Sequence, residues 1–338
     1  MNTNKKNVKN MKEVPIFFAV DDNYIPVLSV AIKSMLDNAS KSYKYAIKIL
    51  NTGIKEENKE KFNVFKAENV DIDFVDVSQH MIALADKLHT RDYYSKSTYF
   101  RLFIPKMFPQ YNKALYLDAD IVVTGDISKF YNSFIGTSLL GAVPDEVVQV
   151  TPIFVDYAEK ALGLPVNKYF NAGILIMNLK QLRNFNFEEK FVDLLGKYTF
   201  RVAQDQDYLN VICKNRVWYL NETWDKMPLQ HGCCDVKKLN IIHYNMGRKP
   251  WHADGVLFGE VFWKYAKETN FYDEILHIKA NYTEEDLKKD AEVGANLLQL
   301  AINEVNNPNN YYNLFVKNAD GENDSAFEGE FTVQPANS

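Results

Sequence analysis

Short apolar segments alternate with amphipathic ones along the first 80 residues. PIFFAV (15–20), YAIKIL (45–50) and VDIDFVDV (70–77) predict strands, because they are brief and rich in branched and aromatic residues. Between them lie IPVLSVAIKSML (25–36) and the charged EENKEKFNVFKAEN (56–69), whose apolar residues recur at helical spacing. This β-α-β-α-β order predicts an α/β fold with a mostly parallel sheet.

The same alternation continues to about residue 275. Further strands are predicted at ALYLD (114–118), SLLGAV (138–143), AGILIMNL (172–179), RVWYLN (216–221) and LNIIHY (239–244). Further helices are predicted at STYFRLFIPKMF (97–108), FNFEEKFVDLLGKY (185–198), DQDYLNVICK (205–214) and EVFWKYAKET (260–269). We therefore expect one α/β domain over residues 14–275, preceded by a polar extension over residues 1–13.

The pattern changes after residue 275. Thr283 followed by Asp286 predicts the capped start of a helix. The expected buried face of this helix consists of Leu287, Ala291, Gly294, Leu298, Ala301 and Val305. We expect a helical region over residues 276–305 that packs on the main domain. Residues 306–338 end in an acidic tail with few branched apolar residues, which predicts disorder.

Composition and charge narrow the class of protein. The 338 residues are 46% hydrophobic and 25% charged, as is typical of a globular protein. The net charge of -5 argues against nucleic acid as a partner, since phosphate contacts need a concentrated basic face. No stretch approaches the roughly 20 apolar residues of a membrane span, and PIFFAV is too short for a signal peptide. We expect a cytoplasmic protein with three reduced cysteines and make no prediction of its oligomeric state.

Two aspartates follow the apolar segment KALYL. Asp118 and Asp120 come at the end of a predicted strand, and open α/β sheets bind ligands outside the carboxyl ends of their strands. Carboxylates with this spacing can hold a hard divalent cation such as Mg²⁺ or Mn²⁺ when the chain bends. Aspartates are also common in turns, so the pair alone leaves both interpretations open.

Other polar residues are expected at the same edge of the sheet. FFAVDDNY ends the first predicted strand and brings Ala19, Asp21 and Asn23 there, although such residues also serve as turn and helix-cap residues. HYNMGRKPW follows the last strand; His243 can bind a metal and Lys249 a phosphate, although a lone histidine can also be structural. A glycine-rich phosphate loop is absent from the sequence, so a metal and side chains would have to hold any diphosphate.

Six motifs occur in order between Val14 and Phe262: FFAVDDNY, STYFRL, LYLDADIVV, FNAGILIMNL, DQDYLN and HYNMGRKPW. Together they resemble glycosyltransferase family 8, the retaining family that includes bacterial lipopolysaccharide galactosyl- and glucosyltransferases and the glycogenins. The resemblance implies a GT-A fold, in which a UDP-sugar lies across the carboxyl edge of a Rossmann-like sheet. It also implies a divalent cation on the diphosphate, usually Mn²⁺, with Mg²⁺ as the alternative.

The resemblance implies roles for individual residues. The metal ligands would be Asp118, Asp120 and His243. The donor-binding residues would be Ala19, Asp21, Asn23, Arg101, Asp118, Ala119, Asp120, Asn171, Ala172, Asp205, Gln206, His243, Gly247 and Lys249. The catalytic residues would be Asp205, Gln206 and Asp207, which could otherwise be the acidic first turn of a helix. The acceptor contacts would be Tyr93, Tyr94 and Asp145.

The implied reaction transfers galactose or glucose, with retention, from UDP-galactose or UDP-glucose to a saccharide or lipid-linked saccharide. Such an enzyme would act in lipopolysaccharide or cell-surface glycan synthesis, in the cytoplasm or peripherally at the inner membrane face. Arg101 is expected to touch the donor sugar and the second aspartate, Asp120. Gln206 is a neutral amide and a poor nucleophile, so Asp207 is the better candidate if a covalent intermediate forms. The sequence does not choose between that route and front-face attack.

The chain departs from the family pattern at one position, and two other classes of protein stay open. Several relatives carry glycine where this chain has Met246, and glycine comes one residue later at Gly247, so the loop over the phosphates is expected to differ. DADIVV also fits the start of haloacid-dehalogenase-like phosphatases, which would make Asp118 a nucleophile but leave AVDDNY and HYNMGRKPW unexplained. The fold could also belong to a catalytically inactive nucleotide-sugar-binding protein.

Overall fold

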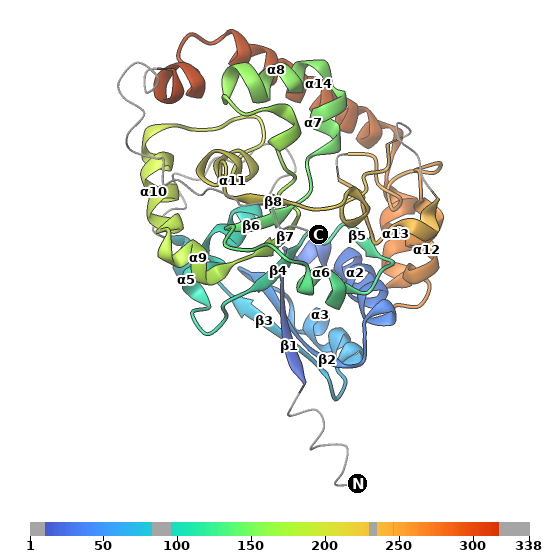
Figure 1. The fold of residues 1–338 in the computed structure, drawn as a ribbon. Helices are drawn as coiled ribbons and strands as arrows, with labels where there is room; N and C mark the ends of the chain where they lie inside the picture. Colours follow the sequence, from blue (N-terminus) through green and yellow to red (C-terminus); the bar gives the residue numbers. More distant parts are fainter. Residues whose placement is uncertain (1–10, 83–95, 230–234, 246, 318–338) are drawn as a thin grey trace.

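The computed structural model describes residues 11–82, 96–229, 235–245 and 247–317, and Figure 1 shows a central sheet with helices on both faces. Within these residues, seven strands form the sheet in the order β3-β2-β1-β4-β7-β6-β8. They are β1 (Lys12–Ala19), β2 (Tyr43–Asn51), β3 (Val70–Asp76), β4 (Ala114–Leu117), β6 (Leu140–Ala142), β7 (Ile174–Met177) and β8 (Val217–Tyr219). Each coincides with a strand predicted from the sequence, and β1 begins two residues before the expected domain start.

The pairing of the strands determines which chain segments meet at the carboxyl edge. The strands β1, β2, β3 and β4 are parallel to one another, whereas β7 is antiparallel to both β4 and β6. The register between β4 and β7 pairs Leu117 with Ile174. The residues just after β4 therefore lie beside the residues just before β7. The prediction of an α/β fold with a mostly parallel sheet is confirmed.

A second, two-stranded sheet lies beside the main one. It pairs β5 (Ile121–Val123) with β9 (Ile241–His243) in antiparallel orientation, and the register sets Ile121 opposite His243. The sequence pattern predicts β9 but does not separate β5 from the apolar segment before Asp118. The chain leaves the main sheet between β4 and β5, so the two aspartates lie at this bend rather than inside a strand.

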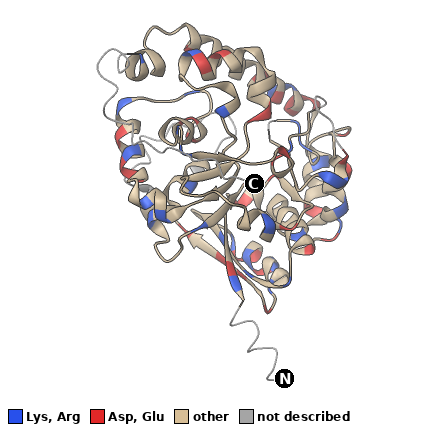
Figure 2. Ribbon diagram, in the orientation of Figure 1, with Lys and Arg blue, Asp and Glu red and all other residues tan. Residues whose placement is uncertain are grey.

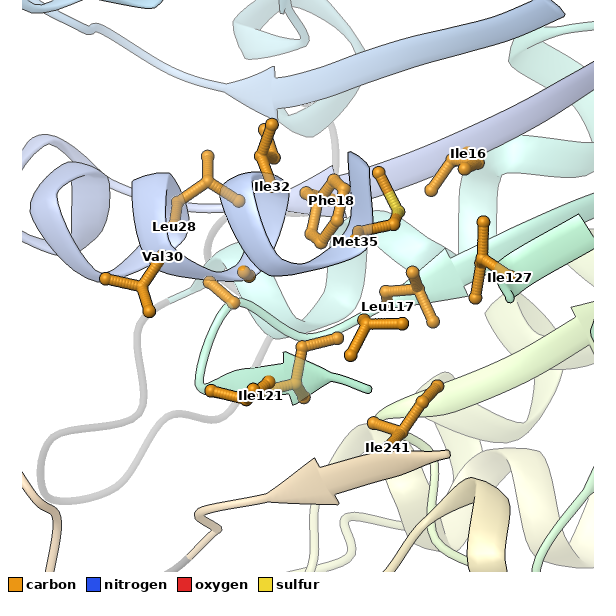
Figure 3. Close-up of a cluster of buried hydrophobic side chains, with 14 of the residues drawn as sticks. Ile16, Phe18, Leu28, Val30, Ile32, Met35, Leu117, Ile121, Ile127 and Ile241 are labelled. Atoms are coloured by element: carbon orange, nitrogen blue, oxygen red, sulfur yellow. The ribbon is translucent and has the colours of Figure 1, made fainter. Parts of the chain in front are cut away.

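Alternating side chains of the central strands build two cores. Ile16 and Phe18 of β1 pack on one face, together with β5 and β9 as Figure 3 shows, whereas Phe17 packs on the other face. The first face is covered by α2 (Ile25–Asn38), η2 (Phe62–Phe65), α6 (Ile127–Asn132), α12 (Gly259–Ala266) and α13 (Tyr272–Asn281). The helix α3 (Glu56–Lys61), which precedes η2, has no buried residue. The second is covered by the 3₁₀-helix η3 (Lys96–Phe103) and by α5 (Ile104–Met107), α9 (Leu179–Asn184), α10 (Phe187–Lys197) and α11 (Asp205–Ile212).

Short helical segments connect the strands and the longer helices. They are η1 (Asp22–Tyr24), η2 (Phe62–Phe65), α4 (Ser78–Ile82), α7 (Glu146–Val150), α8 (Pro152–Asp156), the π-helix η4 (Tyr157–Ala161), η5 (Val166–Lys168), η6 (Glu222–Trp224) and η7 (Val236–Lys238). Of these, α7 and α8 lie at the top of the view in Figure 1, beside the C-terminal helix. They form the far wall of the cavity described below.

The C-terminal helix α14 (Glu284–Asn306) starts with the predicted capping box. The side chain of Thr283 accepts from the Asp286 amide, and the Asp286 carboxylate accepts from the Thr283 amide. The predicted buried face is wrong in part: Ala301 is buried, but the Leu287 and Leu298 side chains are 37% and 39% exposed. The helix packs on α8 and η4 through a neighbouring face that includes Leu297.

The chain continues past α14 into a π-helix, η8 (Tyr312–Val316), and Asn310 between them is buried. The boundary expected at residue 275 falls inside α13. Residues 318–338 lie outside the described residues, so disorder there stays a prediction. Among the helices of the described residues, none is both long and apolar enough to cross a membrane. Lys and Arg are interspersed with Asp and Glu on the outer helices α10, α12 and α13 (Figure 2).

Candidate active site

A cavity of about 220 Å³ opens at the carboxyl edge of the sheet. It lies where β1 and β4 end and β7 begins, and its lining includes Ala19, Asp21, Ala119 and Gly173. The cavity extends to residues of α7, α8, α11 and α14. Parallel strands that deliver their carboxyl ends to one edge explain why the polar residues predicted after β1 and β4 meet here.

Three of these side chains form a cluster suited to a metal ion. Asp118 directly follows β4, Asp120 precedes β5, and His243 ends β9 beside Asp120, because β5 and β9 pair at that point. The Nε2 atom of His243 lies 3.4 Å from Oδ1 of Asp120 and 3.9 Å from Oδ2 of Asp118. One ligand atom from each residue lies within 4.8 Å of the others. Two carboxylates and an imidazole are ligands that Mn²⁺ accepts, so the residues fit a divalent cation.

Asp225 lies behind His243, and the sequence analysis missed it. The Nδ1 atom of His243 lies 2.9 Å from Oδ1 of Asp225, whose side chain is fully buried. This contact leaves Nε2 of His243 facing the two aspartates. Burial would lower the pKa of His243, but the carboxylates of Asp225 and Asp120 outweigh it and raise that pKa to about 10. No local motif marks Asp225, which lies in an irregular segment 18 residues before His243.

Two buried cations balance the aspartates. The Nζ atom of Lys249 lies 2.5 Å from Oδ2 of Asp120 and 2.6 Å from the carbonyl oxygen of Tyr244. Burial would raise the pKa of Asp120, but Lys249 and His243 outweigh it and keep that pKa below its ordinary value. Arg101 extends from η3, with Nη2 3.0 Å from Oδ1 of Asp118 and Nε 3.1 Å from Oδ2 of Asp205.

The contact of Arg101 differs from the expected one. The guanidinium pairs with the first aspartate, Asp118, whereas the second, Asp120, pairs with Lys249. The reason is that η3 packs against β1 and β2, and from there the Arg101 guanidinium lies over the ring of Tyr116 in β4 at 4.2 Å. Tyr116 also donates a hydrogen bond to Oδ1 of Asp118 at 2.9 Å. Each aspartate therefore has its own cation.

A network of amides lies next to the cluster. The backbone amide of Ala172 donates to Oε1 of Gln206 at 2.9 Å. Nε2 of Gln206 and Nδ2 of Asn171 both donate to Oδ2 of Asp145, at 3.1 and 3.2 Å. The other oxygen of Asp145 accepts from the Val148 amide and caps α7. These contacts bring four of the predicted residues to one wall of the cavity.

The carboxylates of DQDYLN lie in different environments. Burial raises the pKa of Asp205 to about 6 although Arg101 opposes this effect, and the residue lines the cavity. Asp207 has no exposed surface, and its carboxylate accepts from the hydroxyls of Tyr157 and Tyr169 at 2.8 and 2.7 Å and from the Ala203 amide at 2.8 Å. Asp207, expected as a catalytic residue, thus lies in the core and outside the cavity lining, and its catalytic role stays a prediction. Helix periodicity turns residue 207 away from residue 206 and toward the core.

Several other predicted residues lie outside the cavity lining or outside the described residues. Asn23 is exposed and contributes its backbone amide to the helix cap formed by Asp21, with Oδ1 of Asp21 accepting at 3.0 Å. Gly247 lies against Asp290 of α14 rather than in the cavity lining. The predicted acceptor contacts Tyr93 and Tyr94 lie outside the described residues.

Comparison with known proteins agrees with this geometry. The model of glycosyl transferase family 8 matches residues 15–255. The chain is 30% identical over 192 residues to lipopolysaccharide 1,2-glucosyltransferase of Escherichia coli (strain K12), a match covering 52% of this chain and 55% of that enzyme.

Two solved structures are similar to the fold. Galactosyltransferase LgtC, in complex with donor and acceptor sugar analogs, has a TM-score of 0.62 and 27% identity over 76% of this chain and 96% of that chain. The bifunctional glycosyltransferase WbbM in its apo form has a TM-score of 0.70 and 27% identity, covering 80% of this chain but only about half (52%) of that one. The fold is GT-A, and the family match excludes the phosphatase interpretation. The chain is a glycosyltransferase that belongs to glycosyl transferase family 8.

Proposed function

We propose that this protein is a retaining, metal-dependent glycosyltransferase that moves galactose or glucose from a UDP-sugar to a saccharide or lipid-linked saccharide. The observation that carries the proposal is the cluster of Asp118, Asp120 and His243 at the carboxyl edge of the sheet. The similarity to LgtC, whose structure holds donor and acceptor sugar analogs, supports a sugar donor and a sugar acceptor. A cytoplasmic location with peripheral contact at the inner membrane face stays a prediction.

The metal cluster and the residues beside it suit a nucleotide diphosphate. A divalent cation on Asp118, Asp120 and His243 would act as a Lewis acid on the diphosphate as it leaves. Lys249 lies beside Asp120 and can add positive charge on the same side. Ala19 and Asp21 also line the cavity, and uridine and its ribose are expected beside them.

The donor sugar is expected between Arg101, Asp205 and the amide network. Arg101 is held on two sides by Asp118 and Asp205, so its guanidinium is fixed before a substrate binds. The carboxylate of Asp205 can accept sugar hydroxyls, and the amides of Gln206 and Asn171 are fixed on Asp145 beside them. This arrangement orients the ring without placing a charged nucleophile under the anomeric carbon.

The burial of Asp207 supports front-face attack over a covalent intermediate. Both of its oxygens accept hydrogen bonds from tyrosine hydroxyls. The neighbouring residue that does line the cavity, Gln206, is a neutral amide. In the front-face route the bond from the anomeric carbon to the diphosphate oxygen breaks as the acceptor oxygen bonds on the same face. The acceptor proton passes to the departing diphosphate oxygen, and the ring carries transient positive charge. Asp207 then acts by positioning Tyr169, whose hydroxyl lies 3.3 Å from Nε2 of Gln206.

The experiment is to measure UDP release from UDP-galactose and UDP-glucose with Mn²⁺ and with excess chelator. We expect release only with the metal, and loss of both turnover and metal-dependent UDP binding in Asp118→Ala and Asp120→Ala. The exposed Asp193→Ala is the control for a lost carboxylate. Retained metal-dependent UDP affinity in both cluster variants would contradict the proposed site. The anomeric configuration of the product, read by NMR, tests retention.

A further inference from the structure

Gln204, in the wall of the cavity, has two features that destabilise the folded protein. The residue is 2% exposed, and among the described residues neither its amide nitrogen nor its amide oxygen has a hydrogen-bond partner. Its backbone has φ 49° and ψ −117°, a region that residues other than glycine rarely adopt. Each feature destabilises the folded protein, so their combination in a cavity wall points to a ligand that uses the amide.

The neighbours of Gln204 in the chain show which groups lie beside it. The preceding residue, Ala203, donates its amide to Asp207, which also holds Tyr157 of η4. The next residue, Asp205, pairs with Arg101 on the side of Asp118. Gln204 is therefore flanked by a residue that bonds Asp207, which holds Tyr157 of η4, and by the donor residue Asp205.

The cavity has an apolar wall on the side of α7, α8 and α14. Val147 and Val148 come from α7, Phe154 from α8 and Leu297 from α14. The α7 part of this wall is fixed to the donor side, because Asp145 both caps α7 at Val148 and accepts from Gln206. A ligand group on these residues would thus lie next to the reacting sugar.

Helix α14 closes this wall and is held at both ends. Asp290 lies against Gly247 and accepts a hydrogen bond from Tyr282, whose ring stacks on His252 at 3.8 Å. Near its other end, Glu304 accepts from the hydroxyl of Tyr198 at 2.9 Å. Leu297 lines the cavity between these two anchors, and Figure 1 shows α14 passing beside α7 and α8. The helix lies outside the residues that match the family, 15–255.

We propose that Gln204, Val147, Val148, Phe154 and Leu297 form an acceptor subsite for a saccharide with an apolar aglycone. The inference rests on the proposed function and names its acceptor class. The Gln204 amide would donate to and accept from hydroxyls of the acceptor sugar. The side chains of this apolar wall offer no hydrogen bonds, so binding there gains free energy only by burying carbon, as an alkyl or aryl group next to the sugar would provide.

The first experiment measures affinity and stability of Gln204→Met, with the exposed Gln299→Met as control. Methionine keeps the length of the side chain but cannot pair with a hydroxyl. Removing an unpaired buried amide should raise the melting temperature of the ligand-free protein by about 2–6 °C. The affinity for octyl β-glycosides, measured by calorimetry with UDP and Mn²⁺ present, should fall roughly 3- to 10-fold. A lower melting temperature or an unchanged affinity would overturn the role of Gln204.

The second experiment compares methyl and octyl β-glycosides of glucose, galactose and N-acetylglucosamine as probes. Each methylene that the wall buries strengthens binding roughly fourfold, so at least one octyl glycoside should bind about tenfold more tightly than its methyl partner. Leu297→Ser and Val147→Ser should each reduce this preference, whereas Leu298→Ser, exposed on the neighbouring face of α14, should not. UDP affinity and melting temperature check that the variants are folded. No octyl preference across the panel would overturn the subsite.

The proposed function is tested separately on the wild-type protein. Metal-dependent UDP release without an octyl preference would leave the glycosyltransferase assignment intact and overturn only the apolar subsite. Absence of UDP release from both UDP-sugars would instead overturn the proposed donor, and the acceptor inference with it.

Discussion

At the scale of single residues, the orientation of His243 depends on a carboxylate that does not face the cavity. Asp225 is buried, and its Oδ1 atom lies 2.9 Å from Nδ1 of the imidazole. While Nδ1 carries the proton, Nε2 is a lone-pair donor for a cation. An imidazole without this contact could adopt the other tautomer, in which a proton on Nε2 would block coordination.

We therefore predict that Asp225→Asn lowers the affinity for Mn²⁺ by about 10- to 100-fold, as is usual when a carboxylate behind a metal-binding histidine is removed. Calorimetric titration of Mn²⁺ into the protein with UDP present measures this. ¹⁵N NMR of the metal-free protein should report a lower pKa of the His243 imidazole in Asp225→Asn, because the Asp225 carboxylate raises that pKa, and a purely structural role of Asp225 would not produce this change. Glu222→Gln, an exposed change in the same segment, is the control. Equal Mn²⁺ affinity in Asp225→Asn and wild type would contradict the orienting role.

Asp205 should make stability depend on pH. Burial raises the pKa of Asp205 to about 6, above the ordinary 3.8, so between these values the folded state holds a proton that the unfolded state has lost. The unfolding free energy therefore falls as pH rises from about 4 to 6, and the loss persists above pH 6. The full shift corresponds to about 3 kcal/mol, an upper value for this single group.

The measurement is urea unfolding of wild type and Asp205→Asn at pH 4.5 and pH 7.0. The stability of wild type relative to the variant should be lower at pH 7.0 than at pH 4.5. Asp193→Asn, at an exposed position on α10, controls for the loss of a distant carboxylate. A difference between wild type and Asp205→Asn that does not change with pH would show that Asp205 is ionised throughout this range.

At the scale of elements, the strands were predictable and the bend after β4 was not. Short apolar runs bounded by polar residues located β1, β4 and β7, since these strands are largely buried on both faces. The strand β3 was located by its alternation of polar and apolar residues. The segment IVV of β5 is only three residues long and pairs with β9, which lies about 120 residues later. Pairing over such a separation has no local signal in the sequence.

The orientation of helices was less predictable than their limits. Thr283 and Asp286 located the start of α14, because a capping box is a local interaction. Which face of α14 is buried depends on α8 and η4, and this choice exposes Leu287 and Leu298. In the same way, the acidic start of α11 indicated a polar surface, but tyrosines from distant segments bury Asp207 completely.

The start of β7 lies so close to the end of β4 that a side chain at Gly173 would collide with the metal cluster. A Cβ atom at Gly173 would lie 2.5 Å from both Oδ2 of Asp118 and Cε1 of His243, far inside contact distance. We predict that Gly173→Ala displaces these ligands and lowers metal-dependent UDP affinity at least tenfold, with circular dichroism unchanged. Gly196→Ala on α10, where a Cβ meets open space, should keep the affinity and gain slightly in stability. Unchanged UDP affinity in Gly173→Ala would mean that the cluster tolerates a shift and does not bind the metal tightly.

At the scale of the whole molecule, the site joins segments from most of the chain. Asp21 follows the first strand, Asp118 and Asp120 lie about a third of the way along the chain, and Lys249 and Leu297 come from the last third. Both cores converge on this edge of the sheet, with Phe18 and Phe17 of β1 on opposite faces. A ligand in the cavity therefore contacts parts of the protein that must come together when it folds.

This arrangement predicts that UDP and Mn²⁺ stabilise the protein together far more than either does alone. Without UDP, a cation must compete with Arg101 and Lys249, which already pair with Asp118 and Asp120. The diphosphate adds negative charge that both the cation and Lys249 can neutralise, so each ligand should increase the affinity for the other by the same factor. With both ligands at about 100 times their dissociation constants, the melting temperature should rise by roughly 5 °C, and excess chelator should reverse most of the rise. Differential scanning fluorimetry with UDP, Mn²⁺ and both ligands measures this, with Asp120→Ala as the variant that should lose the combined effect. If UDP alone gave the full rise, the cation and the diphosphate would not share this site.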